Sequence, residues 1–222
     1  MTSNATYPQV FLDANALVKV AYSISHHHRD PKGRKSALRL FMERGVIAFS
    51  TGTLQFAKTI MLIAEGATET LGFKLSDDDR NTVAMELVEA VQGPRPLIEL
   101  VSLPQTRNLD DCRRSFHEKL AESWYNTVDW DREDRMMILE ASTAYAKYGL
   151  IKTRNGYYRP KPMILASDDK QVRLAAGKLD QGLRNAILET PCIEPLQSQL
   201  VNPVIHVISY AELKQLVQWY TS

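Results

Sequence analysis

Short apolar runs alternate with longer amphipathic stretches along this chain. The apolar runs are rich in β-branched residues and occupy residues 9–12, 46–49, 97–103, 163–166 and 204–208. Their length suits strands that are buried on both faces, which periodicity alone cannot distinguish from short helices but which the flanking turn residues favour. Strands of this kind separated by helices are typical of a parallel sheet in an α/β protein.

The intervening stretches carry apolar residues at three-to-four spacing, which predicts amphipathic helices. They occupy residues 36–43, 53–71, 76–91, 110–125 and 131–148. Ser76 and the three aspartates after it supply a cap and an acidic first turn, and Gly149 closes the last helix. In the second stretch, one side is shared by Leu54, Ala57, Ile60, Met61 and Ala64. The pattern predicts a three-layer α/β/α sandwich with a central, mainly parallel five-stranded sheet.

Two polar segments interrupt this alternation. SISHHHRDPKGR occupies residues 23–34, and a segment at 150–162 contains TRNGYYRPKP. Turn residues predict that both are exposed loops inserted into a single domain that spans residues 1–222. A chain of 222 residues with 44% hydrophobic and 24% charged content is long enough to bury one sizeable core.

Composition narrows the function classes without choosing one. The formal net charge of +1 excludes a uniformly basic nucleic-acid binder, although a local basic patch could still hold phosphates. No apolar run reaches the roughly 18 residues that span a bilayer, and the N-terminal MTSNATYPQ lacks the order of a signal peptide. Cys112 and Cys192 have no metal-type spacing, which favours two reduced thiols over a disulfide scaffold or a zinc ribbon. We therefore expect a cytoplasmic protein that does not contact the membrane.

The histidines and tryptophans allow structural interpretations. His26, His27 and His28 are adjacent, and neighbouring side chains on a regular element do not easily share one ion. Because the run lies in a segment with proline and glycine, we interpret it as part of a loop. Three aromatic residues, Trp124, Tyr125 and Trp130, could stack on a nucleotide, but their place at the end of an amphipathic helix predicts that they pack in the core.

One carboxylate interrupts the apolar stretch VFLDANALV at residues 10–18. Asp13 directly follows the first predicted strand and precedes a helical segment. In an open parallel sheet, ligands bind outside the carboxyl ends of the strands, so Asp13 is placed to face such a crevice. Capping of the following helix is an equally good interpretation.

Two further acidic clusters have a related placement. Asp168 and Asp169 end the apolar run at 163–166, and DWDRED at 129–134 begins the long predicted helix, where acids also complement the helix dipole. Carboxylates that converge in a partly dehydrated cleft repel one another, and a divalent cation removes that cost. Oxygen ligands favour Mg²⁺ or Mn²⁺, which can orient water for attack on phosphorus. Phosphodiester hydrolysis is the chemistry that this set predicts.

In order and spacing these segments resemble the PIN-domain family of metal-dependent nucleases, over nearly the whole chain. VFLDANALV resembles the opening motif, which implies Asp13 as a metal ligand and Asn15 as a residue that orients water or a ligand. DREDRMMILEASTAYAKYG resembles the late acidic helix, which implies Asp134 in preference to Asp131.

The last motif of the resemblance is PMILASDDKQVRLAA. Its hydroxyl position corresponds to Ser167 and its acid to Asp169, with Asp168 as the alternative after a shift of one residue. The resemblance implies an Mg²⁺- or Mn²⁺-dependent endoribonuclease that acts on RNA. It also implies a toxin held by an antitoxin or a defence effector, and a homodimer.

One departure from the family pattern concerns the acid expected early in the helix after the second strand. Gln55 falls near that place, and Glu65 lies ten residues further on, about 15 Å along a straight helix. A PIN-like scaffold that binds RNA or a protein without cleaving is therefore the alternative function. An aspartyl-phosphate phosphatase fits less well, because Asn15 stands where a second aspartate is needed.

The segment at 150–162 supplies candidate RNA contacts. We expect it to lie near the cleft, where its cations can hold phosphates and its tyrosines can stack on bases. The candidates are Arg154, Tyr157, Arg159 and Lys161. An exposed hairpin around Asn155-Gly156 is the structural alternative.

Overall fold

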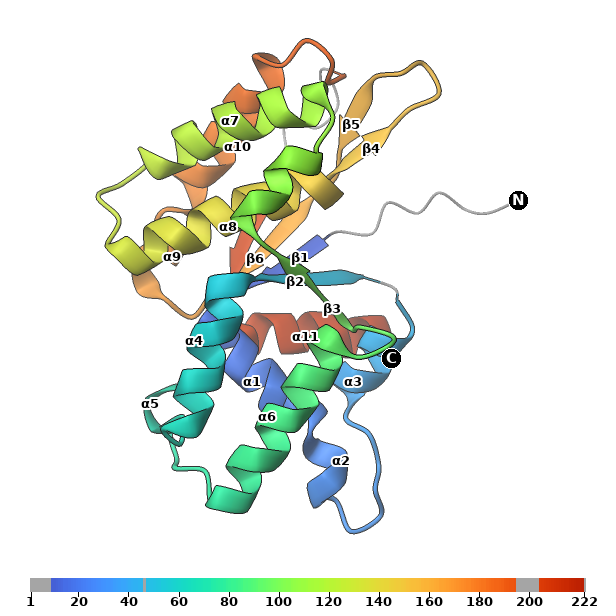
Figure 1. Ribbon diagram of the computed structural model, residues 1–222, viewed down its shortest axis with the longest axis vertical. Helices are drawn as coiled ribbons and strands as arrows, with labels where there is room; N and C mark the ends of the chain where they lie inside the picture. The colour runs from blue at the N-terminus through green and yellow to red at the C-terminus, as the bar shows by residue number, and fades with distance from the viewer. Residues whose placement is uncertain (1–8, 46, 195–203, 222) are drawn as a thin grey trace.

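The computed structural model describes residues 9–45, 47–194 and 204–221. Its centre is a five-stranded sheet in the order β3-β2-β1-β6-β7, in which all neighbouring strands are parallel (Figure 1). The strands are β1 (Gln9–Leu12), β2 (Ala48–Gly52), β3 (Ile98–Val101), β6 (Met163–Ala166) and β7 (Ile205–Ile208). The predicted parallel α/β sheet is confirmed.

Helices cover both faces of the sheet, so the protein is a three-layer α/β/α sandwich (Figure 1). One face is covered by α7 (Asp111–Tyr125), α8 (Arg132–Tyr148) and α10 (Ala176–Leu188). The other is covered by α1 (Ala14–Ile24), α3 (Ala37–Glu43), α4 (Thr53–Ala64), α6 (Asp77–Gln92) and α11 (Tyr210–Thr221). Shorter elements are α2 (His26–Arg29), α5 (Thr68–Leu71), the 3-10 helix η1 (Leu103–Asn108) and α9 (Lys170–Leu174).

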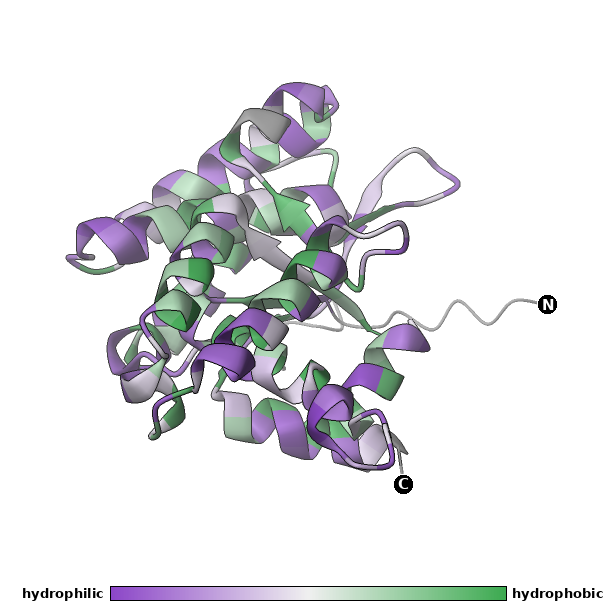
Figure 2. Ribbon diagram, turned by 60° about the horizontal axis from the view of Figure 1, so that its bottom comes forward, coloured by the Kyte–Doolittle hydropathy of each residue, from purple (hydrophilic) through white to green (hydrophobic). Residues whose placement is uncertain are grey.

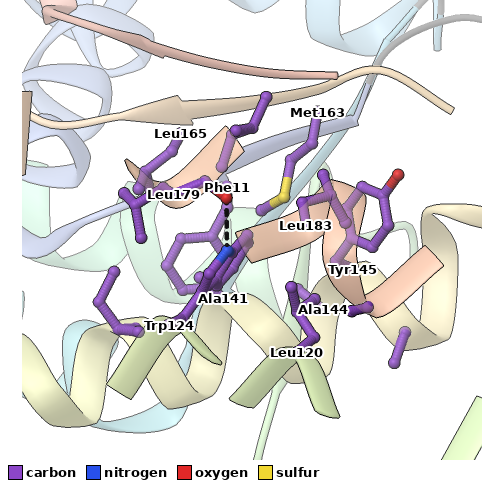
Figure 3. Packing of buried hydrophobic residues seen from close by; sticks show 14 of the residues in the cluster. Phe11, Leu120, Trp124, Ala141, Ala144, Tyr145, Met163, Leu165, Leu179 and Leu183 are labelled. Atoms are coloured by element: carbon purple, nitrogen blue, oxygen red, sulfur yellow. Dashed lines mark hydrogen bonds between the residues drawn. The ribbon is translucent and has the colours of Figure 1, made fainter. Parts of the chain in front are cut away.

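Successive strand residues point to opposite faces, and both faces are buried. Phe11 and Leu165 pack under α7, α8 and α10, whereas Leu12 and Ala166 face the helices on the other side. Figure 3 shows the first of these cores around Phe11, where Trp124 Nε1 donates a hydrogen bond of 2.8 Å to the Leu179 carbonyl. Colouring by hydropathy places apolar residues on the strands and polar ones along outer helix faces (Figure 2). Trp124 and Trp130 are buried, as predicted, whereas the same prediction is wrong for Tyr125, which is exposed.

The second strand lies two residues later than its apolar pattern predicts. It includes Ser50 and Thr51, which are both buried. The Thr51 hydroxyl donates to the Leu12 carbonyl at 2.9 Å, and the Ser50 hydroxyl donates to the Val10 carbonyl at 3.3 Å. Hydroxyls that are satisfied in this way can enter a buried strand, which a purely apolar criterion misses.

The helix predicted at 53–71 is two helices with a different buried face. Ala67 has a φ of 51° and Gly66 a φ of 96°, so the chain leaves the helical conformation between α4 and α5. α4 buries Gln55, Thr59 and Ile63, while Leu54 and Met61 are exposed. Gln55 and Thr59 bond to the amide and the carbonyl of Ala14 respectively, and these polar contacts fix the rotation of α4 against α1.

The two polar insertions are partly regular. Residues 26–29 form α2 rather than a loop. The later insertion forms an antiparallel hairpin of β4 (Leu150–Lys152) and β5 (Tyr158–Pro160), which confirms the hairpin interpretation. α10 lies outside the predicted helices, because LDQGLRNA carries a glycine and several polar residues within its helical period.

The expectation of two separate thiols is wrong in this structure. Cys112 in α7 and Cys192 after α10 form a disulfide, with their Cα atoms 6.1 Å apart and a sequence separation of 80. Packing of α7 against α10 brings the two positions together, and no local spacing reveals such a long-range pair. Within the described residues, no helix combines the length and the apolar character that a bilayer crossing requires.

Candidate active site

The first predicted acid lies where two strand ends meet. Leu12 at the end of β1 is paired with Ala166 at the end of β6, and the Asp13 amide donates to the Ala166 carbonyl at 3.1 Å. Asp13 and the segment from Ser167 to Asp169 therefore leave adjacent strands at the same carboxyl edge of the sheet. This is the edge at which open α/β sheets bind ligands.

The capping interpretation of Asp13 is confirmed. Its Oδ1 accepts a hydrogen bond of 2.7 Å from the Ala16 amide, so it caps α1. The side chain is also buried, and burial raises the pKa of Asp13 to about 6. The charges of Asp168 and Asp169 raise the pKa further, while the Ser167 hydroxyl and the Ala16 amide lower it. Asp13 is thus a buried acid in the field of two others.

Asp168 and Asp169 are held in different ways. Asp168 accepts from Lys19 Nζ at 2.8 Å and from the Tyr210 amide at 3.1 Å, which connects the site to α1 and α11. Asp169 caps α9 through Oδ1, which accepts from the Gln171 amide at 2.6 Å. Asp169 raises the pKa of both Asp13 and Asp134, so its charge acts on both of the other predicted acids.

The acidic start of α8 separates into two roles. Asp131 is the exposed N-cap and accepts from the Glu133 and Asp134 amides. Asp134 is half-buried, and burial raises its pKa to about 6, with further contributions from Asp131 and Asp169. Lys58, which also pairs with Glu133, acts in the opposite direction. Of these two acids, Asp134 is the one whose ionisation responds to Asp169.

The charges of these carboxylates act on one another, but their oxygens do not form a compact set of metal ligands. In the described part of the chain, no three of the predicted acids place one oxygen each within 4.8 Å of the others. Their oxygen donors and raised pKa values nevertheless fit a hard divalent cation, which favours ionised carboxylates.

The two predicted helper residues have defined partners. Ser167 is fully buried, and its Oγ accepts from the Asp169 amide at 3.1 Å, so it orders the acidic turn after β6. Asn15 Oδ1 accepts from the Thr70 hydroxyl at 3.1 Å. This contact directs the Asn15 oxygen to the α5 region.

Neither Gln55 nor Glu65 is placed as the missing acid. Gln55 Oε1 accepts from the Ala14 amide at 3.2 Å, which occupies its carbonyl oxygen in joining α4 to α1. Glu65 is the exposed C-terminal cap of α4, at the far end of the helix from Gln55.

The sequence analysis missed Glu140, a buried acid on α8. Its Oε1 accepts from the Leu54 amide at 2.8 Å at the start of α4, where Gly52 offers no side-chain cap. Burial raises the Glu140 pKa, while the first amides of α4 and the Gln55 side chain lower it. Its Oε2 is buried without a hydrogen-bond partner among the described residues. The signal was an acid inside the apolar run MMILEASTA.

The predicted RNA-binding hairpin is not beside the acids. β5 leads directly into the amino end of β6, and the Lys161 amide donates to the Gly149 carbonyl at the end of α8. The hairpin therefore lies at the amino edge of the sheet, opposite the acidic turn (Figure 1). The predicted proximity of Arg154, Tyr157, Arg159 and Lys161 to the cleft is wrong, because four strand residues and the length of α8 separate them from it.

A cavity of about 840 Å³ opens beside Asp168 instead. Its walls come from α1, α2, the segment between α2 and α3, α3 itself, α5 and α11. Cations and aromatic rings among its lining residues include Lys19, Arg29, Arg34, Lys214, Tyr22 and Tyr210. The cavity therefore places positively charged side chains and aromatic rings next to Asp168, one of the candidate acids.

Comparison of the chain with protein-family models, with curated proteins and with solved structures returned no match. The fold and the site define an α/β protein with an acidic cluster at the carboxyl edge of a parallel sheet. The resemblance to PIN domains stays a prediction from the motifs in the sequence.

Proposed function

We propose that this protein is a divalent-metal-dependent ribonuclease of the PIN type, which hydrolyses RNA phosphodiester bonds endonucleolytically. The observation that carries the proposal is that Asp13 and the turn from Ser167 to Asp169 leave paired strands at the same carboxyl edge of the sheet. Burial raises the pKa of Asp13, and of Asp134 at the start of α8, to about 6. Acids from different segments, with Asp169 acting on both, form an oxygen-rich site whose charge repulsion a cation would relieve.

The residues of the proposed site have different roles. Asp13, Asp134 and Asp169 would hold Mg²⁺ or Mn²⁺, which supplies an activated water and stabilises the departing oxyanion. Ser167 fixes the turn that carries Asp169. Asp168 is a weaker candidate ligand, because Lys19 and the Tyr210 amide already use its two oxygens.

The cavity beside Asp168 is the proposed approach for RNA. Lysine and arginine side chains attract phosphates, and aromatic rings accept stacked bases. Lys19, Arg34, Lys214 and Tyr22 are the lining residues that suit these contacts. The proposed role is that of a toxin under the control of an antitoxin or of a defence effector, with a homodimer as the proposed assembly. The Cys112–Cys192 disulfide removes the argument from free thiols for a cytoplasmic setting.

The test is cleavage of single-stranded RNA with Mn²⁺ by the wild type, Asp13→Asn and Asp110→Asn. Asp110 is a matched control, since it caps α7 through the same type of contact and lies outside the acidic site. We expect Asp13→Asn to lose at least about 100-fold in rate, equivalent to roughly 2.7 kcal/mol of barrier, and Asp110→Asn to retain activity. Equal cleavage by the wild type and Asp13→Asn would reject the mechanism.

A PIN-like scaffold that binds RNA or a protein without cleavage is the second candidate. The observation that favours it is Gln55, whose carbonyl oxygen is occupied by the Ala14 amide where the family pattern expects an acid. Mn²⁺ titration separates the candidates, because an ion that binds only the folded state raises its stability. In a scaffold without the acidic metal site, Mn²⁺ would change the unfolding temperature of the wild type and of Asp13→Asn by the same amount.

A further inference from the structure

Away from the acidic site, the structure brings two neighbouring histidines to a buried glutamate. His27 and His28 lie on α2, and Glu86 lies on α6. Nε2 of His28 is 2.6 Å from Glu86 Oε1, and Nε2 of His27 is 3.5 Å from the same oxygen. Adjacent side chains on a helix do not easily share an ion, but here one ligand atom from each residue lies within 4.8 Å of the other two. We propose that these three side chains bind a transition-metal ion of the Zn²⁺ type.

The donor set selects the class of ion. Two imidazole nitrogens and one carboxylate oxygen suit Zn²⁺ and its neighbours, whereas Mg²⁺ prefers oxygen ligands alone. With metal–ligand distances of about 2.1 Å, tetrahedral ligand atoms lie about 3.4 Å apart. The separation between His27 and Glu86 already matches this value. His28 would have to move outward by less than about 1 Å, and its half-exposed side chain leaves room for that movement.

Neighbouring groups orient the ligands. His27 Nδ1 lies 3.2 Å from the Ile24 carbonyl, which can only accept; with an ion bound, Nδ1 would donate to this carbonyl and Nε2 would be the ligand atom. Arg39 bonds to Glu86 Oε2, which leaves Oε1 to face the histidines. Arg39 also pairs with Glu43 at 3.0 Å, so its charge is shared between two carboxylates.

The site would also order one wall of the cavity. α2 and the segment after it contribute His26, Arg29, Asp30 and Arg34 to the cavity lining. An ion held by α2 and α6 would cross-link the short helix to a long one. The position of these charged side chains would then depend on the ion.

The experiment titrates Zn²⁺ into the full chain without an affinity tag, after chelator treatment, and measures binding by calorimetry. We expect one ion per chain, with affinity reduced at least about tenfold in His27→Ala and in His28→Ala. His26→Ala is the matched control, because His26 is adjacent in sequence but faces Asp30 at 3.9 Å. Its affinity should equal that of the wild type. Zn²⁺ should also slow amide exchange over residues 25–34 in the wild type.

Several results would overturn the inference. They are the absence of saturable binding, an equal loss in His26→Ala, or binding that survives in His28→Ala but disappears in Asp13→Asn. The last result would place the ion among the acids at the sheet edge. Zn²⁺ binding that persists in Asp13→Asn separates this site from the proposed ribonuclease centre. If an alanine variant fails to fold, His28→Gln retains a polar group at this half-exposed position and should still lose affinity.

Discussion

The carboxylate of Glu140 occupies the space that a side chain at Gly52 would fill. A Cβ atom at position 52 would overlap both the carboxyl carbon and the oxygens of Glu140. The backbone of Gly52 has a φ of −79°, which any residue can adopt, so close approach rather than conformation requires glycine here. The contact joins the end of β2, the start of α4 and the middle of α8 next to the candidate site.

Gly52→Ala should therefore lower the free energy of unfolding by about 1–3 kcal/mol, because the buried carboxylate must leave the first amides of α4. Chemical denaturation measures the change. Gly177→Ala is the matched control, since an added Cβ there meets nothing within 4 Å and lies in α10. It should be neutral or raise stability by up to about 1 kcal/mol. Equal stability of Gly52→Ala and the wild type would contradict the contact.

Asp13→Asn should stabilise the metal-free protein at neutral pH while removing activity. The pKa of Asp13 is raised from 3.8 to about 6, so the folded state holds a proton that the unfolded state releases between these values. Stability therefore falls as pH rises through this window and stays reduced above pH 6. Asparagine keeps the cap on α1 and should raise unfolding free energy at pH 7.5 by about 1–3 kcal/mol.

The measurement is denaturant unfolding of both proteins at pH values from 4 to 7.5, without divalent metal. The stability difference should grow over that interval in favour of Asp13→Asn. A difference that does not vary with pH would show that Asp13 has an ordinary pKa in the folded protein.

Gln55→Glu would place a second carboxylate beside Glu140. Glutamate can still accept from the Ala14 amide, so the contact between α4 and α1 is retained. Two partly buried carboxylates repel, and we expect a loss of about 1–3 kcal/mol at pH 7.5 without metal. Mn²⁺ should restore more stability to this variant than to the wild type, because a cation offsets the added charge. Thermal unfolding with and without Mn²⁺ tests this, and a smaller metal effect in the variant would contradict it.

Substitutions in two groups of lysine and arginine residues test whether RNA binds in the cavity or at the hairpin. Replacing Arg34 and Lys214 in the cavity with glutamate should weaken RNA binding and flatten its dependence on salt. Replacing Arg154, Arg159 and Lys161 with glutamate should leave the affinity within about twofold, because the hairpin lies at the other edge of the sheet. Binding of labelled RNA over a range of salt concentrations measures both. A larger loss of RNA affinity in the hairpin variant than in the cavity variant would indicate that RNA binds at the hairpin.

The sequence correctly predicted the strands whose buried residues are apolar. β1 and β6 have the predicted bounds, because continuous apolar runs make both faces of a strand suitable for burial. It failed where polar side chains are buried with partners, as with Thr51 in β2 and Gln55 in α4. A local pattern does not contain the partner, since the bond to Gln55 comes from a residue 41 positions away.

The same distinction applies to the candidate site. Asp13 and the 168–169 pair were predictable at one edge, because each follows a buried parallel strand and such strands end together. Glu140 was not, since it reaches the site from the third turn of a helix by filling the space above a glycine. The position of the hairpin was misjudged because chain proximity to β6 does not say at which end of the strand a loop lies.

The bond between Cys112 and Cys192 closes a covalent ring around part of the candidate site. Asp134, Glu140, Asp168 and Asp169 lie inside the ring, whereas Asp13 and Gln55 lie on the linear segment that precedes it. A single cut at the tip of the β4–β5 hairpin would leave both pieces in one molecule until the disulfide is reduced. During synthesis the ring can close only after Cys192 has left the ribosome. The acids inside the ring would therefore be covalently linked late, after β1 and Asp13 have been synthesised.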